Sequence, residues 1–191
     1  MIPTKTRKCK VCRQPFEQHQ SFAVWCSPAC GSVLAFKRLA KVKKAAKTIE
    51  RKADQAKREK LKTRSDWMKD AQTAFNAYVR ARDAAKPCIC CGKPLAVEAV
   101  GGGFDCGHYR SVGSAPHLRF DERNAHGQTK QCNRWGAGRA VDYRLGLIAR
   151  IGLEAVEALE ADQAPRKYTV EQLQDIKKHY AALARELRAQ A

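Results

Sequence analysis

The chain has no long apolar run, no apolar leader and few acidic residues, and each absence excludes a class of protein. A membrane-spanning helix needs roughly 18–20 consecutive apolar residues, and no stretch of this sequence approaches that length. The first residues lack the apolar segment and cleavage site of a secretory signal. We therefore expect a cytoplasmic protein with no membrane partner.

The shortage of acidic residues leaves a large positive charge. The 191 residues include 37 Lys and Arg but only 19 Asp and Glu, which gives a formal net charge of +18. This excess is larger than solubility requires and is typical of proteins that bind a phosphate backbone. The basic stretches also lack the bulky apolar faces that insert into lipid headgroups, so nucleic acid is the expected partner.

Nine cysteines in a chain without a secretion signal favour metal thiolates over disulfides. Residues 1–33 contain two close pairs, Cys9 with Cys12 and Cys26 with Cys30, separated by a short polar loop. Each pair can span one edge of a tetrahedron around Zn²⁺. Four thiolates leave no open coordination position, so this segment is expected to be a structural zinc module, which the metal itself helps to fold.

Residues 34–65 are predicted to form a basic helical arm. From Ser32 to Arg64 the sequence is rich in Ala, Lys and Arg and contains no Gly or Pro. Apolar residues recur every three or four positions, which indicates a helix with a thin, Ala-rich seam. The one-sided charge favours an arm that contacts DNA through residues such as Lys41, Lys44 and Arg51, or that flanks a dimer contact; a merely solvated helix is the alternative.

Further helices are predicted on both sides of the central cysteines. Ser65 and Asp66 are typical of a helix start, and the helix is expected to end before Pro87. Another helix is expected to end near Gly152, where a C-terminal helical region of residues 152–191 begins. In it, Thr169 to Gln172 form a capping box, and the helix that follows has a narrow apolar seam. That seam fits a partner or the chain's own core equally well.

Residues 66–151 are predicted to form the central domain, with a second zinc site. Cys88 and Cys91 form a knuckle, and Cys132 lies where a second pair of cysteines is expected. Its partner position holds Thr129, and a threonine hydroxyl is a poor zinc ligand. The fourth thiolate must then come from Cys106 or Cys90, or the site is incomplete. We favour Cys106, since Cys90 lies inside the knuckle.

The polar groups between these cysteines predict a small α+β fold with a ββα core. Leu95 to Val97 and Phe104 to Tyr109 read as two strands joined by a glycine run, and Asn124 to Trp135 as the helix that follows. This arrangement places His108 at the end of a strand, facing the helix. The whole fold would combine this zinc-stapled core with the N-terminal zinc module and the long basic and C-terminal helices.

The same segment holds what phosphodiester hydrolysis requires: a base, a divalent cation and a group that orients the base. His108 can deprotonate water, and Asn124 can orient the His108 ring through an amide hydrogen bond. Asp105, with His126 or Asn133, can bind Mg²⁺ or Mn²⁺. Phosphate contacts are expected from the arginines around the site, which are Arg110, Arg119, Arg123, Arg134 and Arg139.

His108, Asn124 and Asn133, with Asn133 nine residues after Asn124, resemble the HNH (His-Me finger) nuclease motif in an H-N-N form. Almost end to end, the chain also resembles the lambdoid phage NinG (Rap) recombination proteins. The motifs that carry this second resemblance are Cys9-x-x-Cys12, Trp25-Cys26-Ser27-Pro28-x-Cys30, Pro87-Cys88-Ile89-x-Cys91-Gly92, Asp105-x-Gly107-His108-Tyr109-Arg110, Leu118-Arg119-Phe120-x-Glu122-Arg123-Asn124-x-His126 and Cys132-Asn133.

The resemblance implies a metal-dependent endonuclease that acts as a dimer and cuts branched DNA, such as Holliday junctions and D-loops, in the host cytoplasm. The chain departs from that pattern at Thr129, where the family has a cysteine, and at Trp135-Gly136, where a His-Lys pair is common. Two non-nuclease alternatives stay open: a non-catalytic zinc-finger DNA-binding accessory protein of recombination, and an RNA-binding zinc ribbon. Neither gives a reason for the set of Asp105, His108 and Asn124.

Overall fold

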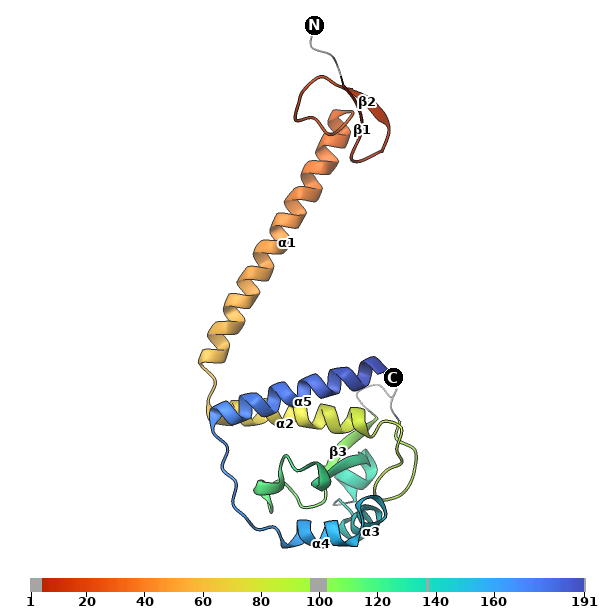
Figure 1. The fold of residues 1–191 in the computed structure, drawn as a ribbon, viewed down its shortest axis with the longest axis vertical. Helices are drawn as coiled ribbons and strands as arrows, with labels where there is room; N and C mark the ends of the chain where they lie inside the picture. Colours follow the sequence, from red (N-terminus) through yellow and green to blue (C-terminus); the bar gives the residue numbers. More distant parts are fainter. Residues whose placement is uncertain (1–4, 97–102, 137, 191) are drawn as a thin grey trace. The chain divides into compact units, whose positions relative to one another are not determined.

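The computed structural model describes the chain apart from residues 1–4, 97–102, 137 and 191. It is a small α+β structure with two two-stranded sheets and several helices (Figure 1). The chain divides into two compact units, residues 1–61 and 62–191. Within the described ranges, none of the helices combines the length and the apolar character of a membrane span.

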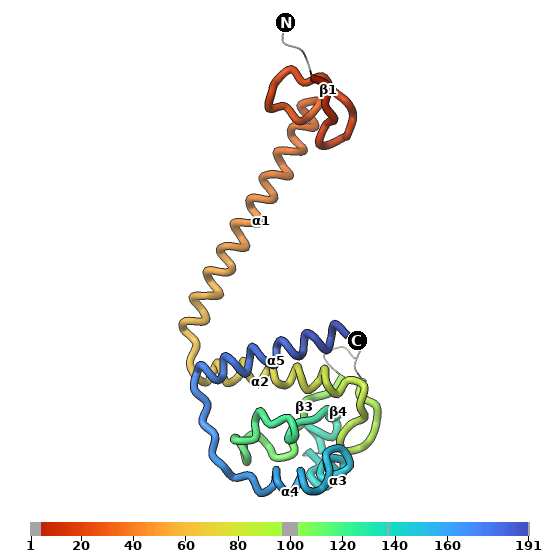
Figure 2. Tube along the Cα trace, in the orientation of Figure 1, coloured from red at the N-terminus to blue at the C-terminus, as the bar shows by residue number. Residues whose placement is uncertain are grey.

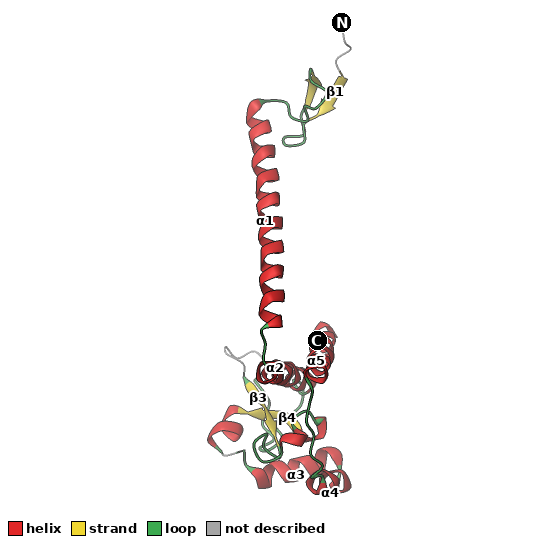
Figure 3. Ribbon diagram, turned by 90° about the vertical axis from the view of Figure 1, so that its left-hand side faces the viewer, coloured by secondary structure: helices red, strands yellow, loops and turns green. Residues whose placement is uncertain are grey.

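The N-terminal unit joins a β-hairpin to a long helix. Strands β1 (Lys5–Lys8) and β2 (Pro15–Gln18) pair antiparallel, as Figure 3 shows. Helix α1 (Pro28–Lys60) starts where the Ser27 side chain accepts a hydrogen bond from the Cys30 backbone N–H, with Pro28 in the first turn. The predicted basic helical arm is present as helix α1, which buries none of its residues. It forms one compact unit with the cysteine-rich segment before it.

The second unit begins with a pair of long helices. Helix α2 (Arg64–Arg82) is capped by a reciprocal bond pair between Thr63 and Asp66, so it starts slightly before the predicted Ser65. It lies beside α5 (Val170–Gln190) and runs in the same direction (Figure 1). The residues that α2 and α5 bury include Trp67, Ala71, Phe75, Val79, Leu173, Tyr180 and Ala184.

Helix α5 therefore packs its apolar seam against its own chain. The predicted capping box is present, because Thr169 and Gln172 bond each other's backbone N–H groups. Tyr180 packs edge-on against Phe75 of α2, with ring centroids 4.9 Å apart. Residues 152–191, expected as a separate region, thus belong to the same compact unit as the central domain.

A two-stranded sheet lies between this helix pair and two shorter helices (Figure 2). Strand β3 (Phe104–His108) pairs antiparallel with β4 (Ala125–Thr129). One face of the sheet packs on α2, where Cys106 and Ala125 join the core around Phe75. The other face packs on α3 (Ala140–Ile151), and the side chain of Tyr143 in this helix is fully buried.

The predicted helix α3 and its break are confirmed. Gly152 has a positive φ of 86°, which L side chains rarely adopt, and α4 (Leu153–Ala161) starts directly after it. Helix α3 also comes very close to the cysteine knuckle. A Cβ at Gly146 would lie 1.8 Å from the Ile89 carbonyl oxygen, so only glycine permits this contact.

Of the three elements of the expected ββα core, only the strand at Phe104–His108 is found where it was predicted in the described residues. The predicted first strand is absent at Leu95 and Ala96, and Val97 lies outside the described residues. The segment predicted as a helix, Asn124–Trp135, instead supplies strand β4 and then the short helix η3 (Gln131–Trp135). The reason is that the backbone of β3 needs a hydrogen-bonded partner, which Ala125–Thr129 provides. Two single-turn helices, η1 (Pro116–Leu118) and η2 (Glu122–Asn124), connect the strands.

Candidate zinc centres and hydrolytic cleft

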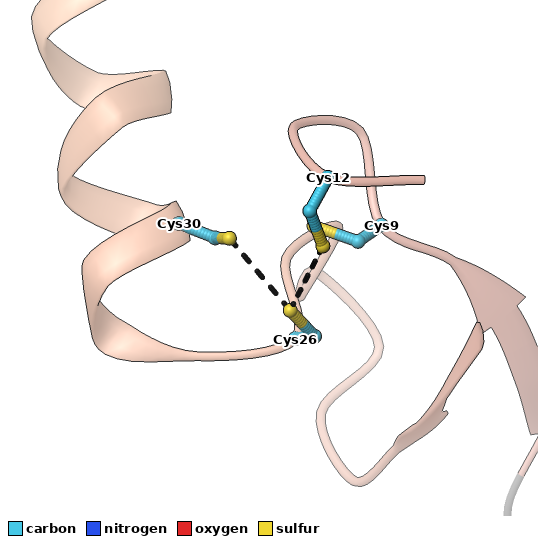
Figure 4. Close-up of side chains that lie close together, drawn as sticks. All are labelled: Cys9, Cys12, Cys26 and Cys30. Atoms are coloured by element: carbon cyan, nitrogen blue, oxygen red, sulfur yellow. Dashed lines mark hydrogen bonds between the residues drawn. The ribbon is translucent and has the colours of Figure 1, made fainter. Parts of the chain in front are cut away.

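The four N-terminal cysteines converge as the spacing predicts. Cys9 and Cys12 lie in the turn of the β1–β2 hairpin, and Cys26 and Cys30 lie at the start of α1 (Figure 4). Their sulfur atoms all lie within 4.8 Å of one another. The Cys12–Cys26 and Cys26–Cys30 sulfur distances are 3.4 and 3.7 Å. Zn–S bonds of about 2.3 Å imply tetrahedral edges of about 3.8 Å, so the cluster can hold zinc.

The protonation of these thiols favours a cation at the cluster. Burial opposes ionisation of Cys9, but the backbone N–H groups of Cys12, Val11 and Cys26 lower the pKa of its thiol to about 6. The neighbouring sulfurs of Cys12 and Cys30 raise the pKa of Cys26 to about 12. A second thiolate is therefore unfavourable until a cation offsets the repulsion between sulfurs.

A second cluster joins the knuckle after α2 to helix η3. The sulfur atoms of Cys88, Cys91 and Cys132 lie within 4.8 Å of one another, so this group can also bind a metal ion. Although burial opposes it, backbone N–H groups of Cys91, Thr129 and Cys90 lower the pKa of Cys88 to about 7. Cys88 therefore ionises more readily than an ordinary cysteine, which suits a metal ligand.

Cys106, the expected fourth thiolate, is not part of this group. Its side chain lies on the α2 face of the sheet, in the apolar core, and burial raises the pKa of its thiol to about 12. The other candidate, Cys90, accepts a hydrogen bond from Gln128 Nε2 at 2.8 Å. Thr129 lies beside the cluster instead, with its hydroxyl oxygen 3.8 Å from Cys88 Sγ.

Replacing Thr129 with cysteine is expected to complete the central site. A fourth thiolate gives Zn²⁺ its preferred tetrahedral sulfur set, so the affinity of this site for zinc should rise, on the order of tenfold or more. Competition with a chromophoric chelator measures the change. Thr129→Ser, which keeps the hydroxyl, is the matched control and should bind zinc as the natural chain does. Equal zinc affinity in the cysteine and serine variants would show that position 129 does not face the metal.

His108 lies at the end of β3 in a state suited to accept a proton. Its Nε2 is 3.1 Å from the Arg119 carbonyl oxygen, and its ring lies 6.0 Å from that of Phe75. A carbonyl can only accept a hydrogen bond, so Nε2 carries the proton. Burial lowers the pKa of His108 below its ordinary 6.5, which keeps the ring neutral at pH 7. The second nitrogen, Nδ1, is then unprotonated and basic.

A cleft of about 400 Å³ opens beside His108. The strand residues that line it, Cys106 and His108, belong to β3, and none belongs to β4. Asn133 of η3 is a further wall residue, so two of the predicted catalytic side chains meet at one cavity. The complete lining is Cys106, His108, Tyr109, Ser111, Val112, Asn133, Gly138 and Ala140.

Asn124 does not hydrogen-bond to His108, contrary to the sequence-based expectation. Its fully buried amide accepts a bond from the Arg110 N–H and donates to the Arg110 and Leu118 carbonyls. These bonds fix the loop that contains Leu118. The carbonyl of the following residue, Arg119, accepts the hydrogen bond from the His108 ring. Asn124 therefore influences the orientation of His108 only through the loop backbone.

Asp105 bonds to Asn133 of the cleft wall, but it does not line the cleft itself, and it lies three positions before His108 in β3, on the opposite face of the strand. The Asn133 side-chain amide donates to Asp105 Oδ2 at 3.0 Å, and Arg134 Nε donates to the same oxygen at 2.8 Å. Burial opposes ionisation of Asp105, but Arg134 and Asn133 lower the pKa of its carboxyl below the ordinary 3.8. The pair can offer two hard oxygen donors to a divalent cation, provided that Arg134 moves off the carboxylate.

His126 is not brought to the same place as His108. In the register of the sheet, His126 pairs with Gly107 while His108 pairs with Ala125. Neighbouring strand positions point to opposite faces, so the two imidazoles lie on opposite sides of the sheet. Burial, followed by Arg82, lowers the pKa of His126 to about 3. Its Nδ1 lies 3.5 Å from the Tyr143 hydroxyl, so His126 is a neutral core residue.

The five arginines expected to contact phosphate all bond within the chain. Arg110 donates to carbonyls of α4 and the following loop, and Arg119 donates to Gln72. The other three pair with carboxylates: Arg123 with Asp121, Arg134 with Asp105, and Arg139 with Asp142. By contrast, Lys41, Lys44 and Arg51 are exposed on α1 and form no ion pair in the described part of the chain.

Asp83 also positions the site and was not identified from the sequence. It is fully buried at the end of α2 and accepts a hydrogen bond from the Gly127 N–H of β4 at 2.9 Å. Although burial opposes ionisation, Arg82, the Gly127 N–H and Lys86 hold the pKa of this carboxyl well below its ordinary range. The only feature of the sequence that could have pointed to Asp83 is its place near the end of a predicted helix, beside Arg82.

The family model and the similar proteins found by comparison all point to one family. The family model described as Bacteriophage Lambda NinG protein matches residues 1–190. The "Protein ninG" of Escherichia phage lambda and that of Escherichia phage 933W are each 41% identical to the chain, covering 98% of it and 96% of the relative. The Salmonella phage P22 protein is 40% identical, with 98% and 97% covered. No solved structure matches. The chain belongs to the NinG family of lambdoid phage proteins.

Proposed function

We propose that the chain is a structure-selective endonuclease that hydrolyses one phosphodiester bond in branched DNA, such as a Holliday junction or a D-loop. The observation that carries the proposal is His108: a neutral imidazole whose protonated nitrogen is held by the Arg119 carbonyl, at a cleft that it shares with Asn133. An imidazole with an unprotonated nitrogen at a cleft can deprotonate a water molecule.

The cleft residues His108 and Asn133, together with Asp105, which bonds to Asn133, offer the groups that hydrolysis requires. His108 Nδ1 takes the proton of the attacking water, while the Nε2–H bond to Arg119 prevents the ring from rotating. Asp105 and Asn133 would hold a Mg²⁺ or Mn²⁺ ion, which would neutralise charge on the scissile phosphate and on the leaving oxygen. Arg134 now pairs with Asp105, and a cation at this carboxylate would compete with that pair, so the guanidinium could then contact a phosphate.

The basic arm supports a nucleic acid substrate. Helix α1 exposes basic residues along its length and packs none of its side chains into a core. This arrangement suits a non-specific contact with the DNA backbone, which attracts branched and linear DNA alike. Selectivity for branches must then come from the unit that holds the cleft. The homodimer implied by the family resemblance stays a prediction.

The proposal is tested with a synthetic four-way junction and a linear duplex of the same sequence. Purified protein should cut the junction when Mg²⁺ or Mn²⁺ is present, leave it intact in EDTA, and cut the duplex far more slowly. Binding of the junction without cleavage under all conditions would favour the alternative of a non-catalytic accessory protein. Preference for RNA over both DNAs would favour the zinc ribbon alternative.

The affinity for DNA is expected to fall steeply with salt concentration, because α1 contacts phosphates. Each lysine or arginine removed from the contact should reduce the slope of log K against log salt by about 1. Lys41→Gln, Lys44→Gln and Arg51→Gln combined should therefore lower that slope by up to about 3, measured by fluorescence anisotropy. Glutamine preserves helix propensity, and circular dichroism checks that α1 remains folded. A slope identical to that of the natural chain would show that these residues do not contact DNA.

A further inference from the structure

Trp135, two residues after Asn133 of the cleft wall, exposes 79% of its surface. Another tryptophan of the same unit, Trp67, exposes only 7% because it packs in the α2–α5 core. An indole is a large apolar surface to leave in water, and tryptophan is usually well buried in folded proteins. No packing role for this ring is found among the described residues, so a ligand is the better explanation for its position.

The backbone that carries Trp135 is held firmly. The residues directly before it, Asn133 and Arg134, both bond to Asp105. After it, the Gly136 N–H bonds to the Gln131 carbonyl at 2.9 Å, and the Arg139 N–H bonds to the Gly136 carbonyl at 3.0 Å. The ring is thus presented from a fixed turn, which lowers the entropy lost when a ligand binds.

The position of the ring relates it to the proposed reaction. Trp135 lies two residues after the cleft residue Asn133, and two residues span at most about 7 Å of chain. Successive nucleotides of one DNA strand are about 3.4 Å apart, so the backbone distance between the two residues is at most roughly two nucleotide steps. Residues 130–142 hold three basic side chains, Lys130, Arg134 and Arg139, and one acidic side chain, Asp142; Arg134 pairs with Asp105 and Arg139 with Asp142, which leaves a net positive charge around the ring. A flat aromatic surface in a basic surrounding suits a nucleic acid base better than an apolar protein segment.

We propose that Trp135 is a stacking platform for an unpaired base next to the bond that is cut. In a linear duplex each base is covered by its neighbours, whereas bases at a branch point or in a displaced strand expose a face. Trp135 would therefore contribute to the preference for branched DNA. This inference rests on the proposed nuclease function for the identity of the ligand.

The test measures binding in EDTA, so that no cleavage occurs, with a four-way junction, a single strand and a linear duplex as probes. Trp135→Ala should weaken binding to the junction and the single strand roughly tenfold or more, and change duplex binding much less. Trp135→Phe, which retains an aromatic face, should restore most of the loss. Trp135→Leu, which retains only apolar bulk, should behave like Trp135→Ala. Tryptophan fluorescence should be quenched by the junction in the natural chain and less so in Trp135→Phe.

The results separate this inference from the proposed function. Equal affinity of Trp135→Ala and the natural chain for all probes would overturn the inference, even if the natural chain cuts junctions. Restored binding in Trp135→Leu would also overturn it, because an apolar contact rather than stacking would then be involved. If the variants behave as expected but no cleavage occurs in Mg²⁺, the stacking site stands and the nuclease function fails.

Discussion

His108→Ala is expected to lower junction cleavage on the order of 10²–10⁴-fold, which is the usual contribution of a general base. The imidazole lies at the cleft and outside both cysteine clusters, so zinc content and junction affinity should stay close to those of the natural chain. Single-turnover cleavage, metal analysis and anisotropy on the same preparation measure the three quantities. Loss of zinc together with activity would show that His108 has a structural role instead.

Two variants control for packing around the ring. His108→Gln can still donate an amide N–H toward the Arg119 carbonyl, so it should preserve the fold yet stay inactive. His179→Ala removes an exposed imidazole on α5, which lies outside the cleft lining, and should cleave at the natural rate. Full activity in His108→Gln would exclude proton transfer by this residue.

The pH dependence of cleavage should report the same group. A base works when it is unprotonated, so activity is present above its pKa and is lost as the pH falls through it. Because burial lowers the pKa of His108, the rate should fall at a pH below that at which a histidine of ordinary pKa would become protonated. A rate that already declines between pH 8 and 7 would point to another group. The profile is measured under single-turnover conditions at saturating Mg²⁺.

The second large effect is expected at the N-terminal zinc module. Cys9→Ser should reduce the zinc content from two ions to one per chain and unfold the β1–β2 hairpin. The module has little core of its own: Phe22 is 67% exposed, so the metal supplies much of the folding energy, on the order of 10 kcal/mol for such sites. Metal analysis and limited proteolysis of residues 5–27 measure the two consequences.

A matched control is available for this experiment. Cys90 lies near the central cluster but belongs to neither group of clustered sulfurs, so Cys90→Ser should retain both zinc ions. If Cys9→Ser kept two zinc ions and a protease-resistant hairpin, the four-cysteine assignment would be wrong. One zinc ion in the natural chain, removed by Cys9→Ser, would show that the three-cysteine centre does not retain metal.

The sequence predicts the parts of this fold that depend on local spacing. The close cysteine pairs, the basic helix, the break at Gly152 and the capping box at Thr169 each follow from a few neighbouring residues, and all are present. The ββα core was misplaced because strand pairing is non-local. Ala125–Thr129 contains polar and small residues and becomes a strand only because β3 lies beside it.

The errors in the candidate site have the same origin. Whether Cys106 reaches the other cysteines, and whether His126 faces His108, depends on which side of the sheet each residue points to. A register that is one residue different would bring His126 to the face of His108. The burial of Asn124 and its bonds to the loop backbone likewise depend on the path of residues 109–124, which no local pattern specifies.

The central claim is that this chain itself hydrolyses branched DNA, and product analysis tests it most directly. Zinc-loaded protein is incubated with an end-labelled four-way junction in Mg²⁺ or in EDTA, beside His108→Gln purified in the same way. We expect discrete cuts that leave a 3′-hydroxyl and a 5′-phosphate, or the reverse pair of ends, formed only in Mg²⁺ and only by the natural chain. An intact junction in Mg²⁺, despite full zinc content and tight binding, would contradict it.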